Sequence, residues 1–305
     1  MALEQADLVL AQLDGDSGKS VHEARKAIKR LRTIVRMLEG ELGSAVCSFE
    51  QDELRAAAAP LGPARDAEVM ASTLDELVRR NRKRLSGRAG VLSLRLALAR
   101  EREQAERALS AQARLDAGRK VAGFRARAEL WQLGPGSDLD VAAAGLRRIY
   151  RQGRQRYGRA AGKHGGRMHT MHQWRKRVKD LRYAAEALRP PSGGPPGGAK
   201  ERKRAREQAK WLRRIAKRAD TLGEMLGEEH DLAVLDEWIS QHGAAAGAGR
   251  GTRRRLSKLI AQRRRKLRRR ALRAGAELYA RRPKRFLARL AKAHRAAGAA
   301  AISRR

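Results

Sequence analysis

The chain has 305 residues, of which 70 are Lys or Arg and 33 are Asp or Glu, so its formal net charge is +37. Self-repulsion on this scale is tolerated mainly when a polyanion neutralises part of it, which favours nucleic acid, an anionic membrane surface or a phosphate polymer as partner. The single Cys47 excludes an intrachain disulfide framework. Good helix formers are abundant and strand formers are sparse, which predicts an all-α protein.

The first residues, MALEQADLVLAQLDGDS, lack the basic start and apolar stretch of a secretory signal peptide. No apolar run approaches the roughly 18 residues that a membrane span needs. We therefore expect a cytoplasmic protein with no membrane span.

The stretch VHEARKAIKRLRTIVRMLE, residues 21–39, predicts an amphipathic helix. At about 100° per residue its apolar residues fall on one sector, and its cations form a strip beside that sector. A merely solvated helix usually mixes Glu with Lys, yet no acid lies between Lys26 and Arg36. The strip consists chiefly of His22, Arg25, Lys26, Lys29 and Arg32.

The same arrangement returns 150 residues later in MHQWRKRVKDLRYAAEALR, which begins at Met171. One such strip is usually a solvated face, but its repetition indicates a binding function. Arg and Lys side chains are well suited to bind phosphate oxygens. Asp180 stands where the first copy has Arg30, and we expect it at the edge of the strip. We expect the two strips to line one groove. The second strip consists of His172, Arg175, Lys176, Lys179 and Arg182.

A second repeated element divides the chain in two. LGPARDAEVM from Leu61 aligns with LGEEHDLAVL from Leu226, and the Gly/Pro-rich residues 133–138 mark a midpoint. The tract PPSGGPPGGA at 190–199 can hold an insertion in the second copy. We predict two four-helix repeats, at residues 1–133 and 139–305.

Two other readings compete with a phosphate-polymer site. The run RRRLSKLIAQRRRKLRRR, residues 253–270, would bind any nucleic-acid backbone. With 4% aromatic residues and no base-reading motif, such binding would be blind to sequence. The alternative for this run is a helix whose Leu256, Ile260 and Leu267 face the bundle while Arg covers its exterior.

An enzyme reading rests on EEHD, residues 228–231, because a His-Asp dipeptide is a metal-ligand element in some phosphohydrolases. Such a site needs further His and Asp ligands, whereas the other histidines lie among arginines. The alternative is that Asp66 and Asp231 hold neighbouring cations in place. We expect no enzyme activity, no cofactor and no metal.

The two basic helices, the two Leu-Gly elements, GLRRIYRQGRQRYGRA at 145–160 and ARRPKRFLARL at 280–290 together resemble the CHAD family, the conserved histidine alpha-helical domain. The resemblance covers nearly the whole chain. It implies two pseudo-symmetric four-helix bundles with a central basic groove or pore that binds inorganic polyphosphate without catalysis. We expect association with polyphosphate granules, and, from the Arg-rich run at 253–270, secondary binding to nucleic acid.

The resemblance carries the binding role to both basic strips, to the fifth residue of each Leu-Gly element and to the basic helix before the second copy. Those positions are His22, Arg25, Lys26, Lys29, Arg32, Arg65, Arg147, Arg148, Arg154, His172, Arg175, Lys176, Lys179, Arg182 and His230.

Overall fold

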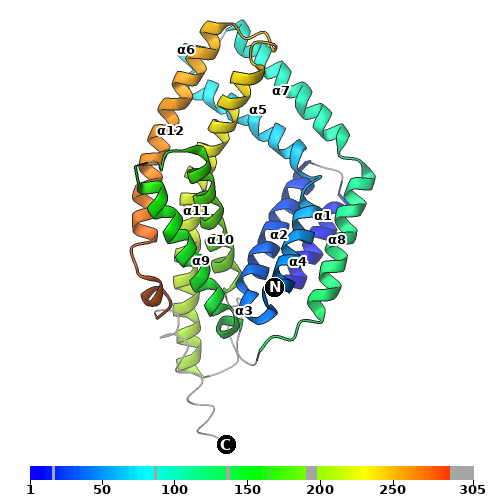
Figure 1. Cartoon of the computed structure of the whole chain (residues 1–305), viewed down its shortest axis with the longest axis vertical. Coiled ribbons are helices and arrows are strands. Elements are labelled where there is room, and N and C mark those ends of the chain that lie inside the picture. The colour runs from blue at the N-terminus through cyan, green and yellow to red at the C-terminus, as the bar shows by residue number, and fades with distance from the viewer. Residues whose placement is uncertain (16–17, 86–87, 135–137, 164, 190–197, 289–305) are drawn as a thin grey trace, which may run out of the picture. The chain divides into compact units, whose positions relative to one another are not determined.

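The computed structural model shows a helical protein. Within the residues that it describes, every regular element is a helix and there is no strand (Figure 1), so the expected all-α class is confirmed. The Gly/Pro tract at 190–197 and the midpoint residues 135–137 lie outside the described part. The described ranges are 1–15, 18–85, 88–134, 138–163, 165–189 and 198–288.

The helices of the first half are α1 (Ala2–Leu13), α2 (Gly18–Met37), α3 (Glu39–Leu42), α4 (Ser44–Ala58), α5 (Gly62–Arg80), α6 (Arg82–Leu85), α7 (Ala89–Ala108) and α8 (Ala111–Glu129). Those of the second half are α9 (Asp138–Ala161), α10 (Met168–Ala187), α11 (Ala199–His242) and α12 (Arg250–Leu278). Helix α1 packs along α8, α5 along α7, and α10 along α9 (Figure 1).

The contacts group the chain into two compact units that interleave along the sequence. Helices α2, α4, α11 and α12 each contribute to both units. The units therefore differ from the repeats at 1–133 and 139–305, a division that stays a prediction. Unit 1 comprises Met1–Leu31, Phe49–Leu130 and Met225–Ala271, and unit 2 comprises Arg32–Ser48, Trp131–Glu224 and Leu272–Arg305.

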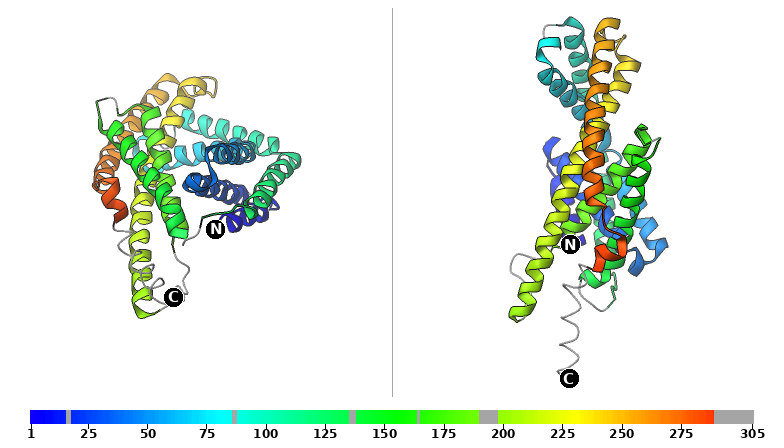
Figure 2. Two further views of the ribbon diagram at one scale, coloured as in Figure 1. Left: turned by 60° about the horizontal axis from the view of Figure 1, so that its bottom comes forward. Right: turned by 90° about the vertical axis from the view of Figure 1, so that its left-hand side faces the viewer.

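The two halves differ in how often their helices break. The described second half has four helices, α9 to α12, whereas the described first half has six helices of 12 or more residues. Pro60 ends α4 in the first copy because proline has no N–H to continue the ladder. Met225 stands at the aligned position, and α11 runs on through it for 44 residues (Figure 2).

The core of unit 1 joins α5 and α7 to the parts of α11 and α12 that belong to it. Leu256, Ile260 and Leu267 of α12 are buried there together with Leu74 and Leu235. The Arg-rich run is therefore a core helix with a basic exterior, as the second of the two interpretations of this run states.

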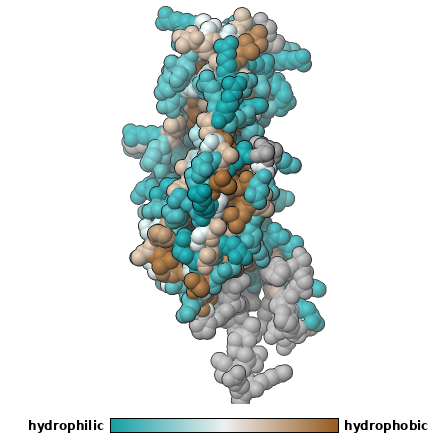
Figure 3. Space-filling view, turned by 90° about the vertical axis from the view of Figure 1, so that its right-hand side faces the viewer, coloured by the Kyte–Doolittle hydropathy of each residue, from teal (hydrophilic) through white to brown (hydrophobic). Residues whose placement is uncertain are grey.

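The surface that carries α7 and α8 is mostly hydrophilic, with scattered hydrophobic patches (Figure 3). Leu92 and Leu96 on α7 and Leu115 on α8 are exposed. Among the described residues, no helix is both long enough and apolar enough to cross a membrane.

The core of unit 2 is aromatic. The ring of Tyr150 on α9 stacks on Phe286 at 3.8 Å and lies 5.4 Å from the ring of Tyr279. Tyr157 packs against Trp174 of α10 at 5.5 Å. Rings from α9, α10 and the end of the chain's described part thus fix these segments to one another.

Gly145 on α9 allows a close helix approach in unit 2. A Cβ at this position would lie 1.9 Å from the carbonyl oxygen of Met37, whereas a Cβ at Gly158 on the same helix would meet open space. We expect Gly145→Ala to lower the free energy of unfolding by about 2 kcal/mol or more, because the backbone must shift. Gly158→Ala should raise it by about 0.5–1 kcal/mol. Urea denaturation of both variants tests this, and equal stabilities would contradict the close approach.

Candidate functional site

The basic strip of α2 lies beside a buried apolar face, as its periodicity predicts. Val21, Ala24, Ile28 and Leu31 are all buried. Among the cations, Lys29 is exposed, whereas His22, Arg25 and Lys26 are half-buried. The strip therefore borders the core instead of standing in open solvent.

Arg25 joins α2 to the beginning of α5 within unit 1. Its guanidinium donates a hydrogen bond to the carbonyl oxygen of Leu61 and lies 3.6 Å from the carboxylate of Asp66. A Cβ at Gly62 would come within 3.2 Å of the same guanidinium, so the glycine leaves it room. These contacts give the Leu-Gly element a structural task, and they agree with the reading of Asp66 as a holder of cations.

His22 lies in a field of like charge. Burial lowers the pKa of His22 first, and the charges of Arg65, Lys26 and Lys29 lower it further, against a smaller opposing effect of Glu23. Glu23 also holds Lys26 at 3.1 Å. The structure thus brings Arg65 of α5 to the strip, and we call His22, Arg25, Lys26, Lys29 and Arg65 the α2 cluster.

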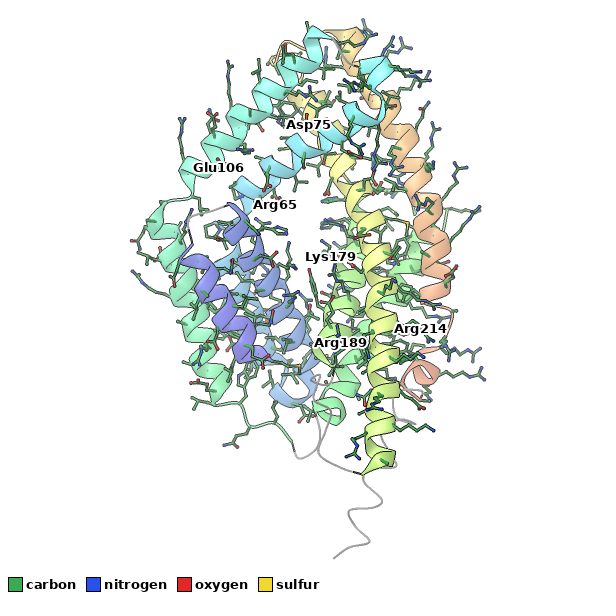
Figure 4. All side chains as sticks on the ribbon, turned by 180° about the vertical axis from the view of Figure 1, so that it is seen from behind. Arg65, Asp75, Glu106, Lys179, Arg189 and Arg214 are labelled. Carbon is green, nitrogen blue, oxygen red and sulfur yellow. The ribbon has the colours of Figure 1, made fainter. Side chains whose placement is uncertain are left out.

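The basic strip of α10 has the same form in unit 2. Met171, Trp174, Val178 and Leu181 are buried, and the cations lie beside this apolar face. Burial is the main cause that lowers the pKa of His172, followed by the charges of Arg175, Lys176, His169 and Lys179. The side chain of Lys179 is labelled in Figure 4.

Arg32, the last predicted cation of the first strip, belongs to unit 2 and lies near α10. The pKa of Lys176 is lowered by burial and then by the charges of Arg177, Arg32 and Arg36. The end of one strip therefore meets the middle of the other inside a single unit. We call His172, Arg175, Lys176, Lys179 and Arg32 the α10 cluster.

The side chain of Asp180 lies in the protein interior, and not at the edge of the strip where we expected it. Its side chain is buried, with 8% of the residue exposed. It accepts a hydrogen bond from Arg36 at 2.7 Å and lies 3.0 Å from Arg177. Thr33 also donates to it, at 3.4 Å. The carboxylate thus pairs with Arg36 at the end of α2 and with Arg177 on its own helix, and both cations compensate its burial.

Arg177 was missed by the sequence reasoning, although a signal was present. It stands on the apolar side of α10, one residue before the buried Val178, where a cation requires a partner. Asp180, three residues on, is that partner, and Gln152 of α9 accepts a second hydrogen bond at 3.1 Å.

Other predicted binding residues already hold protein groups. Arg182 pairs with Glu186 at 2.7 Å and also with Asp220 of α11. Arg148 donates to the carbonyl oxygen of Arg36 at 2.8 Å and lies 3.0 Å from Glu39. These two guanidinium groups fasten helices as well as adding charge.

The remaining three predicted binding residues are Arg147, Arg154 and His230. Arg154 donates from Nε to the carbonyl oxygen of Tyr279 at 3.1 Å, and both Arg147 and Arg154 line a hollow beside α9. His230 is half-buried on α11 in unit 1.

In the EEHD segment, the two glutamates pair with arginines of α12. Glu228 accepts a bidentate pair of hydrogen bonds from Arg263 at 2.6 and 2.8 Å, and the buried Glu229 accepts from Arg264 and Arg268. In the described part of the chain, no group of three or more His, Cys, Asp or Glu side chains is placed to hold a metal ion.

A protein family and two solved structures are similar to this chain. The family model of the CHAD domain matches residues 2–208. A crystal structure of the CHAD domain from the plant Ricinus communis is similar to this chain with 25% identity and a TM-score of 0.62, over 92% of this chain and 89% of that one. PptA from Streptomyces chartreusis is similar with 17% identity and a TM-score of 0.56, over 92% and 96% of the two chains. No curated protein matches the sequence.

The crowding of cations around His172 can be measured. We expect its pKa to lie below the ordinary value of 6.5 and to rise in Lys176→Gln, because a repelling charge is removed. A folded-state pKa below the unfolded one means that stability falls as the pH drops through about 6.5, and that the loss is complete below the folded pKa. Lys176→Gln should reduce this acid-side loss.

NMR titration of His172 and chemical denaturation across this pH range test the expectation. Arg218→Gln is the matched control, since Arg218 is exposed on α11 in the same unit and does not act on His172. A pKa of His172 that is unchanged in Lys176→Gln would contradict the proposed crowding.

Proposed function

The chain belongs to the CHAD family, and from this premise we propose that it binds inorganic polyphosphate and catalyses no reaction on it. The observation that carries the proposal is the α10 cluster, in which cations from two helices gather around His172 and Lys176 and, after burial, lower the pKa of these two groups. A run of phosphates relieves this repulsion, because each anion favours the charged form of the groups around it.

The arrangement fits a linear ligand. His172, Arg175, Lys176 and Lys179 rise along successive turns of α10, about 5.4 Å apart per turn, and Arg32 extends the charge toward α2. Arg offers a planar fork to phosphate oxygens and Lys a mobile point charge. A chain of phosphates that follows the helix can therefore contact several of these groups at once.

The aromatic side chains favour a bare phosphate polymer over single-stranded nucleic acid. Proteins that bind single strands stack bases on accessible aromatic rings. Here Trp174, Tyr150 and Phe286 are buried, and Phe49, which is exposed, is covered by the guanidinium of Arg127 at 4.9 Å. Trp174, the aromatic residue within the α10 strip, therefore offers no accessible ring on which a base could stack.

The residues divide by task in this proposal. The α10 cluster and the α2 cluster contact phosphates, except that Arg25 chiefly positions α2 through Leu61 and Asp66. Arg148 and Arg182 position helices through their carboxylate partners. That one polymer engages both clusters stays a prediction, as does the role of His230. A cytoplasmic location at polyphosphate granules belongs to the same proposal.

A competition experiment tests the choice of ligand. We expect long-chain polyphosphate to displace labelled double-stranded DNA at equal phosphate concentration, with no displacement in the reverse direction. Fluorescence anisotropy at a fixed, stated salt concentration measures both directions, since salt alone changes such affinities strongly. If each polymer displaces the other comparably, the protein binds polyanions in general, and the proposed preference for polyphosphate over DNA is wrong.

Charge reversal tests the assigned residues. Lys29→Glu and Lys179→Glu should each weaken polyphosphate binding by about tenfold or more, and should lower the slope of log affinity against log salt by about 1. Arg269→Glu and Arg218→Glu change the net charge equally at exposed positions and should matter less than about threefold. Arg264 is unsuitable as a control because it pairs with the buried Glu229. Equal losses in all four folded variants would leave bulk charge as the explanation.

A further inference from the structure

A second concentration of cations lies beside α9, outside both clusters. A hollow of about 430 Å³ opens between this helix and the segment that follows α12. Of the seven residues that line it, six are Arg or Lys and none is Asp or Glu. We call it the α9 pocket, and its lining is Arg147, Arg151, Arg154, Arg282, Pro283, Lys284 and Arg285.

Contacts on both sides hold the walls of the α9 pocket together. Arg154 donates from Nε to the carbonyl oxygen of Tyr279 at 3.1 Å. The hydroxyl of Tyr150 donates to the carbonyl oxygens of Leu278 and Arg281, at 3.2 and 3.0 Å. Phe286 then stacks on the ring of Tyr150. The backbone between Arg281 and Phe286 is thus held opposite α9 before any ligand arrives, which reduces the part of the ordering cost that falls on the main chain.

The pocket lies on a different side of α9 from α10. Arg177 of α10 reaches Gln152 and is influenced by Arg156. At about 100° per residue, Arg151 lies about 140° around the helix axis from Arg156. On α10, Lys179 likewise lies about 200° from Arg177. The α10 cluster and the α9 pocket therefore face away from each other across the α9–α10 contact.

The pocket's cations surround a volume instead of following a line. They come from two segments about 130 residues apart in sequence, and a volume of about 430 Å³ falls within the range of about 300–1,000 Å³ that holds small ligands. Six positive groups without a carboxylate among them favour an anion that carries several charges within a short distance.

We propose that the α9 pocket is a second binding site, which takes a compact anion carrying several phosphate groups, such as a triphosphate. A neighbouring hollow of about 920 Å³ shares Arg151 and Arg154 with the pocket and is also lined by Gln152, Gln155 and Tyr157. This hollow gives room, amide groups and an aromatic edge for an organic group joined to the phosphates.

Calorimetric titration with tripolyphosphate tests the site. Arg151→Glu and Arg285→Glu, both at exposed positions, should each weaken binding by about tenfold or more, the effect of losing one charge-assisted contact. Arg218→Glu, at an exposed position of α11, should change the affinity less than about threefold. Arg151→Gln, which removes the charge without reversing it, should give an intermediate loss and guards against a folding defect.

The result is independent of the polyphosphate proposal. Lys179→Glu should leave tripolyphosphate affinity within about threefold, and Arg151→Glu should leave long-chain polyphosphate affinity within the same range. The α9 pocket is refuted if wild-type protein does not bind tripolyphosphate, if Lys179→Glu loses as much as Arg151→Glu, or if Arg218→Glu does.

The same titration with a nucleoside triphosphate tests whether the ligand carries an organic group. Tighter binding than that of tripolyphosphate, lost in Arg151→Glu, supports a ligand that also fills the neighbouring hollow. Equal binding, again lost in Arg151→Glu, supports a site that recognises the phosphates alone. Nucleotide binding that survives Arg151→Glu and Arg285→Glu contradicts the assignment.

Discussion

The buried carboxylate of Asp180 is the interaction on which the arrangement of cations in unit 2 depends. It lies within 3.0 Å of both Arg36 and Arg177, which belong to α2 and α10, and Arg177 in turn reaches Gln152 of α9. Burying such a charge costs several kcal/mol, and its attraction to two guanidinium groups offsets this only when the geometry is close. Removing the carboxylate would leave two cations repelling each other where three helices meet. The acid in the middle of a basic helix is thus what allows the surrounding cations to stay close together.

The chain contains two kinds of arginine. Some are tied to specific carboxylates, as Arg263 and Arg264 are to Glu228 and Glu229, and these stabilise the contact of α12 with α11 in unit 1. Others surround the histidines of α2 and α10, or the hollow beside α9, where cations outnumber the acids near them. The net charge of +37 draws any polyanion toward the protein. The local excess of cations over acids in these regions then determines where phosphates bind.

The sequence predicted well those features that apolar periodicity determines. The buried faces of α2, α10 and α12 follow from apolar spacing. The pairing of Asp180 with Arg36 was out of reach, because 144 residues separate the two and no local pattern links them. The same holds for the α9 pocket, whose walls come from distant segments that the packing of Phe286 on Tyr150 joins. Spacing along one helix reports which residues share a face, but not what lies opposite that face.

The interleaving of the two units bears on how the chain acquires its structure during synthesis. Unit 1 needs residues from Met1 to Ala271, and unit 2 begins at Arg32 and needs α12 to its end. Neither unit can therefore be completed while the ribosome is still translating most of α12. Until then α2 and α10 are nascent cationic helices without all their packing partners, beside the RNA of the ribosome itself. A polyanion that engages them early competes with folding. Asp180 can meet its partners Arg36 and Arg177 once α10 has been made, whereas Glu229 must wait for Arg264 and Arg268 of α12.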